Sequence, residues 1–322
     1  MNIVFLGSGA FGVPSLEALA GSSHRILHVV SQPDRPAGRG KGLMGTAVSG
    51  WAMERGVPLL RVENVNAPET IEMLRGLRPD ALVVIAFGQK LSDELLAIAP
   101  GRAINLHSSL LPKYRGAAPI NWAVINNDAV AGVSVIEVTK VMDGGDIFAS
   151  ASTPIGEAET AGELHDRLAG LGSPLLPGVL DDFAAGRVTR VVQDPLLATR
   201  APKLSREMAW VDFVSPAAIV SARIRGLSPW PGVQVEVVDA GGKLRATATV
   251  LKCRATGLRT QHGVEECGMV LGDRSVACGV GSVELMVVQP VGKKAMELGA
   301  FANGYGFGGG ARVRGVVAVP AL

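Results

Sequence analysis

The chain has 322 residues, of which 48% are hydrophobic and 19% charged, so it is long enough for two folded domains and wholesale disorder is excluded. Its longest apolar runs, such as residues 81–87, are too short to span a bilayer, and no basic segment followed by an apolar one opens the chain, so we expect a cytoplasmic protein that binds no membrane. The three cysteines lie in the last third and match no metal-ligand spacing, so we expect reduced thiols and no metal site.

The net charge of +2 is unevenly distributed along the chain. Residues 1–188 contain 15 Lys and Arg against 19 Asp and Glu, whereas residues 189–322 contain 16 against 10. A basic C-terminal part attached to an acidic N-terminal part indicates a polyanionic partner for the basic part. Ordinary solvation of the surface explains an excess of this size equally well, and the charge alone leaves both interpretations open.

The first half of the sequence alternates short apolar strands with helix-length amphipathic segments. Continuous β-branched runs of this kind predict βαβ units and a mostly parallel sheet. The predicted strands are NIVFL (2–6), ILHVVS (26–31), ALVVIA (81–86), AINLH (103–107), VSVIEV (133–138) and IFASAST (147–153). A long helical pattern follows over about residues 159–184.

The pattern changes in the last third of the chain. Residues 189–207 are basic, punctuated by proline and weakly periodic, which predicts an interdomain linker. Residues 208–322 hold short alternating strands between glycine-rich turns, which predicts an all-β module that closes as a small barrel. The predicted strands are 233–238, 245–251, 268–272, 275–280 and 282–290, and the glycine-rich stretch 301–313 is predicted to be a loop.

Gly7, Gly9 and Gly12 form a G-x-G-x-x-G pattern between the first strand and a helix, which is the fingerprint of dinucleotide-binding folds. Such a site also needs an acidic residue at the end of the second strand, to hold the ribose hydroxyls. Here that strand ends in Ser31 and Gln32, and Asp34 follows only after a proline. We therefore interpret the glycines as packing residues that let the strand turn sharply into its helix.

Polar side chains that could carry chemistry gather after the strand at 103–107. Asn105 and His107 share one face of this strand and emerge at its carboxyl end, where open α/β sheets bind ligands. Asn can donate its amide N–H to a developing oxyanion, and His can transfer protons near neutral pH. Asp143, before Gly144 and Gly145, could orient His107, although alone it reads as a turn residue; Asp146 is the competing carboxylate.

A second candidate region is the loop PDRPAGRGKG (33–42), which holds Arg35, Arg39 and Lys41 among glycines and prolines. It has no apolar anchor, which suits a mobile basic loop that meets phosphates. A solvated surface loop would have the same composition, and the sequence pattern does not separate the two.

Taken together, these segments resemble the methionyl-tRNA formyltransferase family over essentially the whole chain. The matching stretches are QPDRPAGRGKGLM (32–44), INLHSSLLPKYRGAAPINWAV (104–124), MDGGDIF (142–148), APKLSRE (201–207), LSPWPG (227–232) and QPVGKKAM (289–296). The Asn-x-His, S-L-L-P and Asp-Gly-Gly elements are shared by enzymes that use 10-formyltetrahydrofolate. The basic loop, KLSRE and GKKAM are more specific to the enzymes that act on tRNA.

The resemblance implies a Rossmann-like, mostly parallel α/β formyltransferase domain over 1–188, the basic linker over 189–207, and an OB-like β-barrel that binds tRNA over 208–322. It implies formyl transfer from the co-substrate 10-formyltetrahydrofolate to methionine on initiator methionyl-tRNA, for translation initiation, by a monomer that uses neither metal nor NAD. The implied site residues are Asn105, His107 and Asp143 for catalysis; Ser109, Leu110, Leu111, Pro112, Ala86, Phe87 and Gly88 for folate; and Arg35, Arg39, Lys41, Lys203, Arg206, Lys293 and Lys294 for tRNA.

Three other functions fit parts of the sequence. A formyltransferase for an amino-sugar nucleotide or another small amine would use the same folate chemistry, but it has no need of a basic linker and a separate β module. A nicotinamide dehydrogenase would need the acidic strand-end residue that this chain lacks. An RNA-binding protein without activity would leave the pairing of Asn105 with His107 unexplained.

Overall fold

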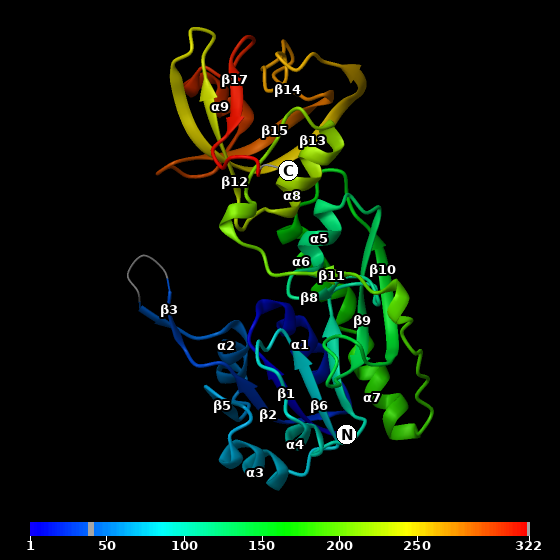
Figure 1. The fold of residues 1–322 in the computed structure, drawn as a ribbon. Coiled ribbons are helices and arrows are strands. Elements are labelled where there is room, and N and C mark those ends of the chain that lie inside the picture. Colours follow the sequence, from blue (N-terminus) through cyan, green and yellow to red (C-terminus); the bar gives the residue numbers. More distant parts are fainter. Residues whose placement is uncertain (38–41, 321–322) are drawn as a thin grey trace. The chain divides into compact units, whose positions relative to one another are not determined.

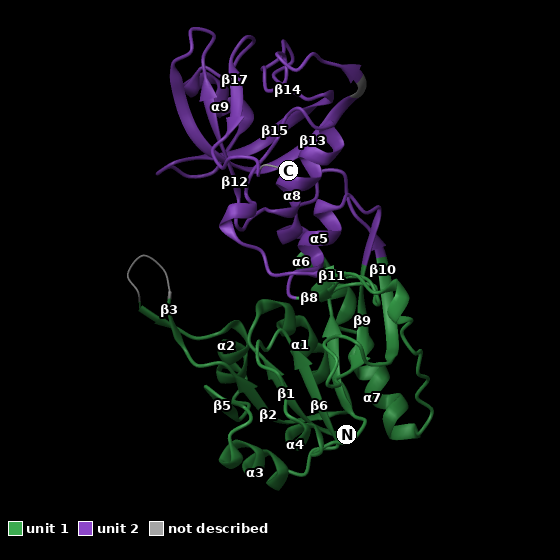
Figure 2. Cartoon of the chain, in the orientation of Figure 1, with its two compact units in different colours: residues 1–116, 132–152, 165–200 green, residues 117–131, 153–164, 201–322 purple. Residues whose placement is uncertain are grey.

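The computed structural model describes residues 1–37 and 42–320, and its internal contacts divide them into two units (Figure 2). Unit 1 comprises residues 1–116, 132–152 and 165–200, and unit 2 comprises residues 117–131, 153–164 and 201–322. Two short segments of the first half of the chain therefore fold with the C-terminal part. None of the helices in the described residues has the length and apolar character needed to cross a membrane.

Unit 1 is built on a seven-stranded sheet in the order β10-β9-β7-β6-β1-β2-β5 (Figure 1). The strands are β1 (Asn2–Gly7), β2 (Arg25–Ser31), β5 (Leu59–Arg61), β6 (Ala81–Ile85), β7 (Ala103–His107), β9 (Val130–Glu137) and β10 (Ile147–Pro154). The pairs from β5 to β7 are parallel, and β9 pairs antiparallel with β7. The predicted mostly parallel α/β domain is confirmed.

The sheet is the centre of the unit 1 core because β1 and β6 are apolar on both faces. Ile3 to Leu6 and Ala81 to Val83 are fully buried. The helices that accompany the sheet are α1 (Val13–Ala20), α2 (Ala47–Glu54), α3 (Pro68–Gly76), α4 (Asp93–Leu96) and α7 (Leu175–Ala185), with the short 3-10 helix η1 at Ala10–Gly12. Side chains begin two of them, since Thr46 accepts a hydrogen bond from Ser49 N and Ser92 from Leu95 N.

The long helix predicted over 159–184 is two helices in the structure. Helix α6 (Ala161–Gly172) ends before Pro174, and α7 begins at Leu175. Proline has no backbone N–H and its ring clashes with the preceding turn, so one helix does not continue through it. Gly186, with φ 66°, ends α7 in the left-handed conformation that glycine adopts without strain.

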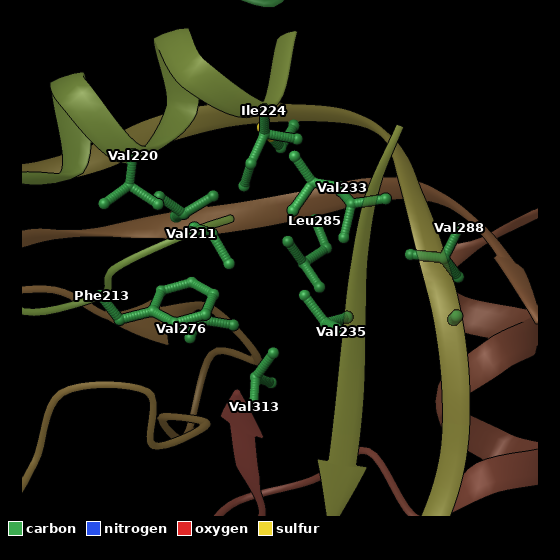
Figure 3. Close-up of a cluster of buried hydrophobic side chains, with 14 of the residues drawn as sticks. Val211, Phe213, Val220, Ile224, Val233, Val235, Val276, Leu285, Val288 and Val313 are labelled. Carbon is green, nitrogen blue, oxygen red and sulfur yellow. The ribbon is translucent and has the colours of Figure 1, made fainter. Parts of the chain in front are cut away.

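Unit 2 is an antiparallel half-barrel whose sheet has the order β14-β15-β13-β12-β17, with β16 paired to β15. Its elements are α5 (Pro119–Ile125), η3 (Arg206–Met208), α8 (Ala217–Gly226), β12 (Val233–Val238), β13 (Leu244–Gln261), β14 (Val276–Ala277), β15 (Val280–Pro290), β16 (Met296–Glu297), α9 (Leu298–Tyr305) and β17 (Arg312–Gly315). Figure 3 shows side chains of α8, β12, β15 and β17 meeting in one buried apolar cluster. The predicted smaller β domain is confirmed.

Two predictions for this unit are wrong in detail. Residues 268–272 form only isolated bridges, through Met269 and Val270, and no strand. The predicted glycine-rich loop begins inside helix α9, because Leu298, Phe301, Ala302 and Tyr305 recur at helical spacing and bury an apolar face. Gly306, with φ 66°, then ends the helix.

The remaining strands are only two or three residues long. Strands β3 (Arg35–Ala37) and β4 (Gly42–Met44) pair antiparallel in the segment predicted to be a basic loop. Strands β8 (Arg115–Gly116) and β11 (Arg200–Ala201) pair with each other, and η2 covers Pro195–Leu197. The expected tRNA residues Arg39 and Lys41 lie outside the described residues.

Candidate active site

Strand β7 carries two of the candidate catalytic residues at its carboxyl end. Ile104 and Leu106 are buried in the core, Asn105 is partly exposed, and only 7% of His107 is exposed. In the described structure the side-chain amide of Asn105 makes no hydrogen bond, so its N–H groups are free to bind a ligand. Because residues two apart in a strand share a face, the amide and the imidazole emerge on the same side of the sheet.

His107 lies between a carbonyl and a carboxylate. Its Nε2 is 3.0 Å from the carbonyl oxygen of Tyr114, which can only accept, so Nε2 carries the proton in this bond. Its Nδ1 is 3.6 Å from Oδ1 of Asp143. Both ring nitrogens thus face oxygen acceptors, one from the loop after β7 and one from the turn of Asp143.

Asp143 is held in place through its other oxygen. The backbone N–H of Gly116 donates to Oδ2 at 2.8 Å, which leaves Oδ1 on the side of His107. Asp146, the competing carboxylate, lies instead 3.8 Å from the guanidinium of Arg190, and its carbonyl oxygen accepts from Glu137 N at 2.9 Å. The structure therefore brings Asp143, and not Asp146, to the imidazole.

Strained backbone conformations occur at several residues of the candidate site. Of six non-glycine residues with positive φ in the described chain, three belong to the candidate site: Ala86 (45°), Tyr114 (63°) and Asp143 (52°). Each costs about 1–2 kcal/mol relative to the ordinary helical or extended conformation. Such strain persists only where surrounding contacts impose it, and it is commonest at functional sites.

The expected folate residues form two turns, one after β6 and one after β7. In the first, the Phe87 side chain is 98% buried in the core, while Ala86 and Gly88 have positive φ. In the second, the Ser109 hydroxyl donates to Lys113 O at 2.7 Å and Leu111 N donates to Ser134 Oγ at 3.2 Å. Leu111 is also buried, so the side chains of Phe87, Ser109 and Leu111 hold the two turns in shape and are not exposed to a ligand.

The glycines of the fingerprint are packed against the protein itself. A Cβ on Gly7 would lie 2.6 Å from Phe5 and 2.8 Å from Ile85 O, and one on Gly9 would lie 3.1 Å from the Cβ of Ala86. Gly9 N also donates to Ala86 O at 3.3 Å. These contacts support the interpretation that the glycines pack β1 and η1 against the end of β6.

The cationic side chains expected to bind tRNA differ in their partners. Arg35, in β3, donates to Glu63 at 2.9 Å. In unit 2, Lys203, Lys293 and Lys294 are exposed and form no ion pair or side-chain hydrogen bond with described residues. Arg206 is also exposed, and its charge attracts the neighbouring carboxylate of Glu207. Most other cations of that unit have partners. Lys252, Arg254 and Arg314 pair with acids, and Arg223, Arg225 and Arg312 donate to carbonyls.

The sequence patterns missed Gln193 and Arg115. Gln193 lies in the stretch expected to be a linker, yet only 7% of it is exposed and its amide contacts the turn of Asp143. Arg115 Nη2 donates to the side chain of Gln193 at 2.7 Å. The β-branched pair Val191 and Val192 was the one local signal of an ordered segment there.

Comparison with known proteins covers both units. The family model "Formyl transferase" matches residues 1–180, and "Formyl transferase, C-terminal domain" matches residues 203–306. The methionyl-tRNA formyltransferase of Citrifermentans bemidjiense is 39% identical over 305 residues, covering 95% of this chain and 94% of that protein. The methionyl-tRNA formyltransferase of Anaeromyxobacter dehalogenans is 41% identical over 308 residues, covering 94% of this chain and 97% of that protein.

Solved structures share the fold at low sequence identity. A sugar 3N-formyl transferase, WlaRD, aligns with a TM-score of 0.62 and 15% identity over 91% of this chain and 99% of its own. The N-formyltransferase from Helicobacter canadensis in complex with folinic acid and dTDP-3-aminofucose aligns with a TM-score of 0.62 and 14% identity over 89% of this chain and 98% of its own. With two family models matching in order and relatives about 40% identical over nearly the whole length, the chain belongs to the methionyl-tRNA formyltransferase family.

Proposed function

We propose that this protein transfers the formyl group of 10-formyltetrahydrofolate to the free α-amine of methionine on initiator methionyl-tRNA. The observation that carries the proposal is the extent of the similarity, which runs through the catalytic unit and through residues 203–306 of the C-terminal unit. Since the reaction prepares initiator tRNA for translation, we place the protein in the cytoplasm. We further propose that it acts as a monomer.

Asn105 would stabilise the negative charge that develops on the formyl oxygen. The α-amine attacks the formyl carbon in its neutral form, which is well populated near neutral pH because free α-amino groups have a pKa of about 7.7–8.0. The free amide of Asn105, at the end of β7, supplies an N–H donor for the oxygen. A donor of this kind contributes about 3–4 kcal/mol to the transition state.

His107 and Asp143 would transfer the protons of the reaction. With Nε2 bound to the Tyr114 carbonyl, Nδ1 is the nitrogen that is left to donate to the leaving amine nitrogen of the folate. Asp143 would stabilise the positive charge on His107 across 3.6 Å. It would also relay, through water, the proton that the attacking amine loses back to His107, which restores the imidazolium after its proton has gone to the leaving nitrogen. Neither step needs a metal ion.

The two turns after β6 and β7 would form the walls of the folate site. The carbonyl of Phe87 is fixed by Gln32 Nε2 at 3.0 Å and by Ser8 Oγ at 3.4 Å, so the turn of residues 86–88 is rigid before a ligand arrives. Leu110 and Pro112 would cover the ring from the second turn. The bound folate supplies the activated formyl group, and the protein orients it toward Asn105.

Residues 1–188 would carry the chemistry, and residues 189–207 and 208–322 would hold the tRNA backbone. The unpaired cations of unit 2 support this division, because a lysine without an acidic partner can neutralise a phosphate at no cost in lost ion pairs. We expect replacement of Lys293 and Lys294 by Ala to raise the KM for tRNA and to reduce its salt dependence. Arg254→Ala, which removes a cation already paired with Glu284, is the matched control.

The decisive experiment compares acceptors with 10-formyltetrahydrofolate as donor. Methionyl initiator tRNA, methionyl elongator tRNA, free methionine and an amino-sugar nucleotide are each incubated with the protein, and formylated product is measured. Transfer to initiator tRNA alone supports the proposal. Transfer to the amino-sugar nucleotide and not to tRNA overturns it in favour of a small-amine formyltransferase.

A further inference from the structure

Residues 190–199, which follow α7, contact both loops that hold the catalytic pair. Val191 exchanges two backbone hydrogen bonds with Ile147, just beyond the Asp143 turn, at 2.8 and 2.9 Å. At the other end, Thr199 Oγ1 accepts from Tyr114 N at 2.9 Å, and Thr199 O accepts from Arg115 N at 2.8 Å. Tyr114 is the residue whose carbonyl binds His107. We call residues 190–199 the brace.

Gln193 is the residue of the brace that reaches the Asp143 turn. Its Nε2 donates to the carbonyl oxygens of Asp143, at 2.9 Å, and of Gly145, at 2.7 Å. Its Oε1 accepts from Arg115 Nε at 3.1 Å and Nη2 at 2.7 Å. Every donor and acceptor of the amide is therefore used, and the side chain is only 7% exposed, so its orientation is fixed.

The turn depends on these polar contacts because it has little apolar anchoring. Val141 and Met142, which precede Asp143, are 61% and 69% exposed. Asp143 itself has φ 52°, a conformation that must be imposed from outside. Gly145 fits only because it lacks a side chain, since a Cβ there would lie 2.0 Å from Glu137 O.

We propose that Gln193, held by Arg115, is a positioning residue for formyl transfer: it fixes the strained Asp143 turn so that the carboxylate faces His107. It acts through the backbone carbonyls of Asp143 and Gly145. This inference rests on the proposed function, since it assigns a role in the same reaction. Its signature is a fall in kcat with unchanged substrate binding.

The test is Gln193→Met, which keeps the length of the side chain and removes both N–H donors. We expect kcat to fall by about 10- to 100-fold, as for a misplacement of about 1 Å at a catalytic group, with KM for tRNA and folate within about threefold of the parent. Arg115→Lys, which keeps the charge and loses the planar fork, should give a smaller fall in kcat. It also serves as the second variant if Gln193→Met folds poorly.

Asn66→Leu is the matched control for loss of a loop-bracing amide in the same unit. Its amide likewise joins two backbone groups, Lys90 O and Ser92 N, each at 2.8 Å. It should lower the melting temperature with kcat unchanged. If the parent is active and both Gln193→Met and Arg115→Lys keep its kcat, this inference is refuted and the proposed function is not. An equal loss of kcat in Asn66→Leu also refutes this inference alone. An inactive parent refutes the proposed function, and this inference with it.

Discussion

Replacing Asp143 by Asn removes the charge beside His107 and little else. Asn is the non-glycine residue that best tolerates positive φ, so the strained turn at φ 52° is preserved, and its oxygen still accepts from Gly116 N. The His107 and Asp143 side chains are only 7% and 15% exposed, and their nearest atoms are 3.6 Å apart. With an effective dielectric constant of about 20, the lost attraction for the imidazolium is about 4–5 kcal/mol.

Part of this attraction also stabilises the enzyme before the transition state is reached, and that part does not contribute to the rate. We therefore expect Asp143→Asn to lower kcat by about 10²- to 10³-fold, since each tenfold step corresponds to about 1.4 kcal/mol. Single-turnover formyl transfer to methionyl initiator tRNA measures the chemical step directly. Folate binding, measured by fluorescence titration, should be unchanged. A variant with kcat within threefold of the parent would show that the carboxylate charge is not used in catalysis.

Three further predictions follow from other contacts. Asn105→Ala should lower kcat by about 10²-fold or more while the melting temperature stays the same, and equal turnover would remove Asn105 from the mechanism. Arg225→Met removes a guanidinium that is only 5% exposed and that donates to Glu159 O at 3.0 Å and to Ser221 Oγ at 3.2 Å, so the free energy of unfolding in urea should fall by about 3 kcal/mol; a loss below 1 kcal/mol contradicts this. Burial raises the pKa of Cys253 and of Cys278 to about 12 each. Since these thiols ionise in the unfolded chain at about pH 8.5, stability should be complete below that pH and decline as the pH rises toward 12; Cys253→Ala should flatten the decline measured by urea unfolding at pH 7 and pH 10.

The predictable parts of the fold are those with a dominant local signal. Each predicted strand of the first half occurs, because runs such as residues 81–85 are apolar on both faces and have no amphipathic helical alternative. The mutual approach of His107 and Asp143 could be expected for a related reason. His107 is the last residue of β7, Asp143 follows β9, and the sheet order puts β9 directly beside β7.

The parts that could not be predicted depend on contacts between segments far apart in the chain. No residue pattern near Gln193 predicts that its side-chain amide donates to two carbonyl groups about fifty residues away in the chain. Likewise, the segment 153–164 reads as the approach to a helix, yet Lys252 reaches Glu163 and Arg225 reaches Glu159, so this segment folds with unit 2. Local propensity carries no information about such pairs, whose energy is realised only when both segments are in place.

The glycine fingerprint lies at a point of the sheet where the glycines are needed for packing, and the sheet order shows where that point is. The chain runs from β1 outward to β2 and β5 and then returns to β6 on the other side of β1, so the crevice of an open sheet belongs between β1 and β6. There the glycines let the chain close on itself: Gly9 N binds Ala86 O, and Ser8 Oγ and Gln32 Nε2 bind Phe87 O. One backbone N–H of the glycine turn, that of Gly9, is thus already paired with the turn that follows β6. The partly exposed amide of Asn105 and the imidazole of His107 lie on β7, the strand that pairs with β6 on the side away from β1. The candidate catalytic groups of this sheet are therefore one strand away from the glycine turn.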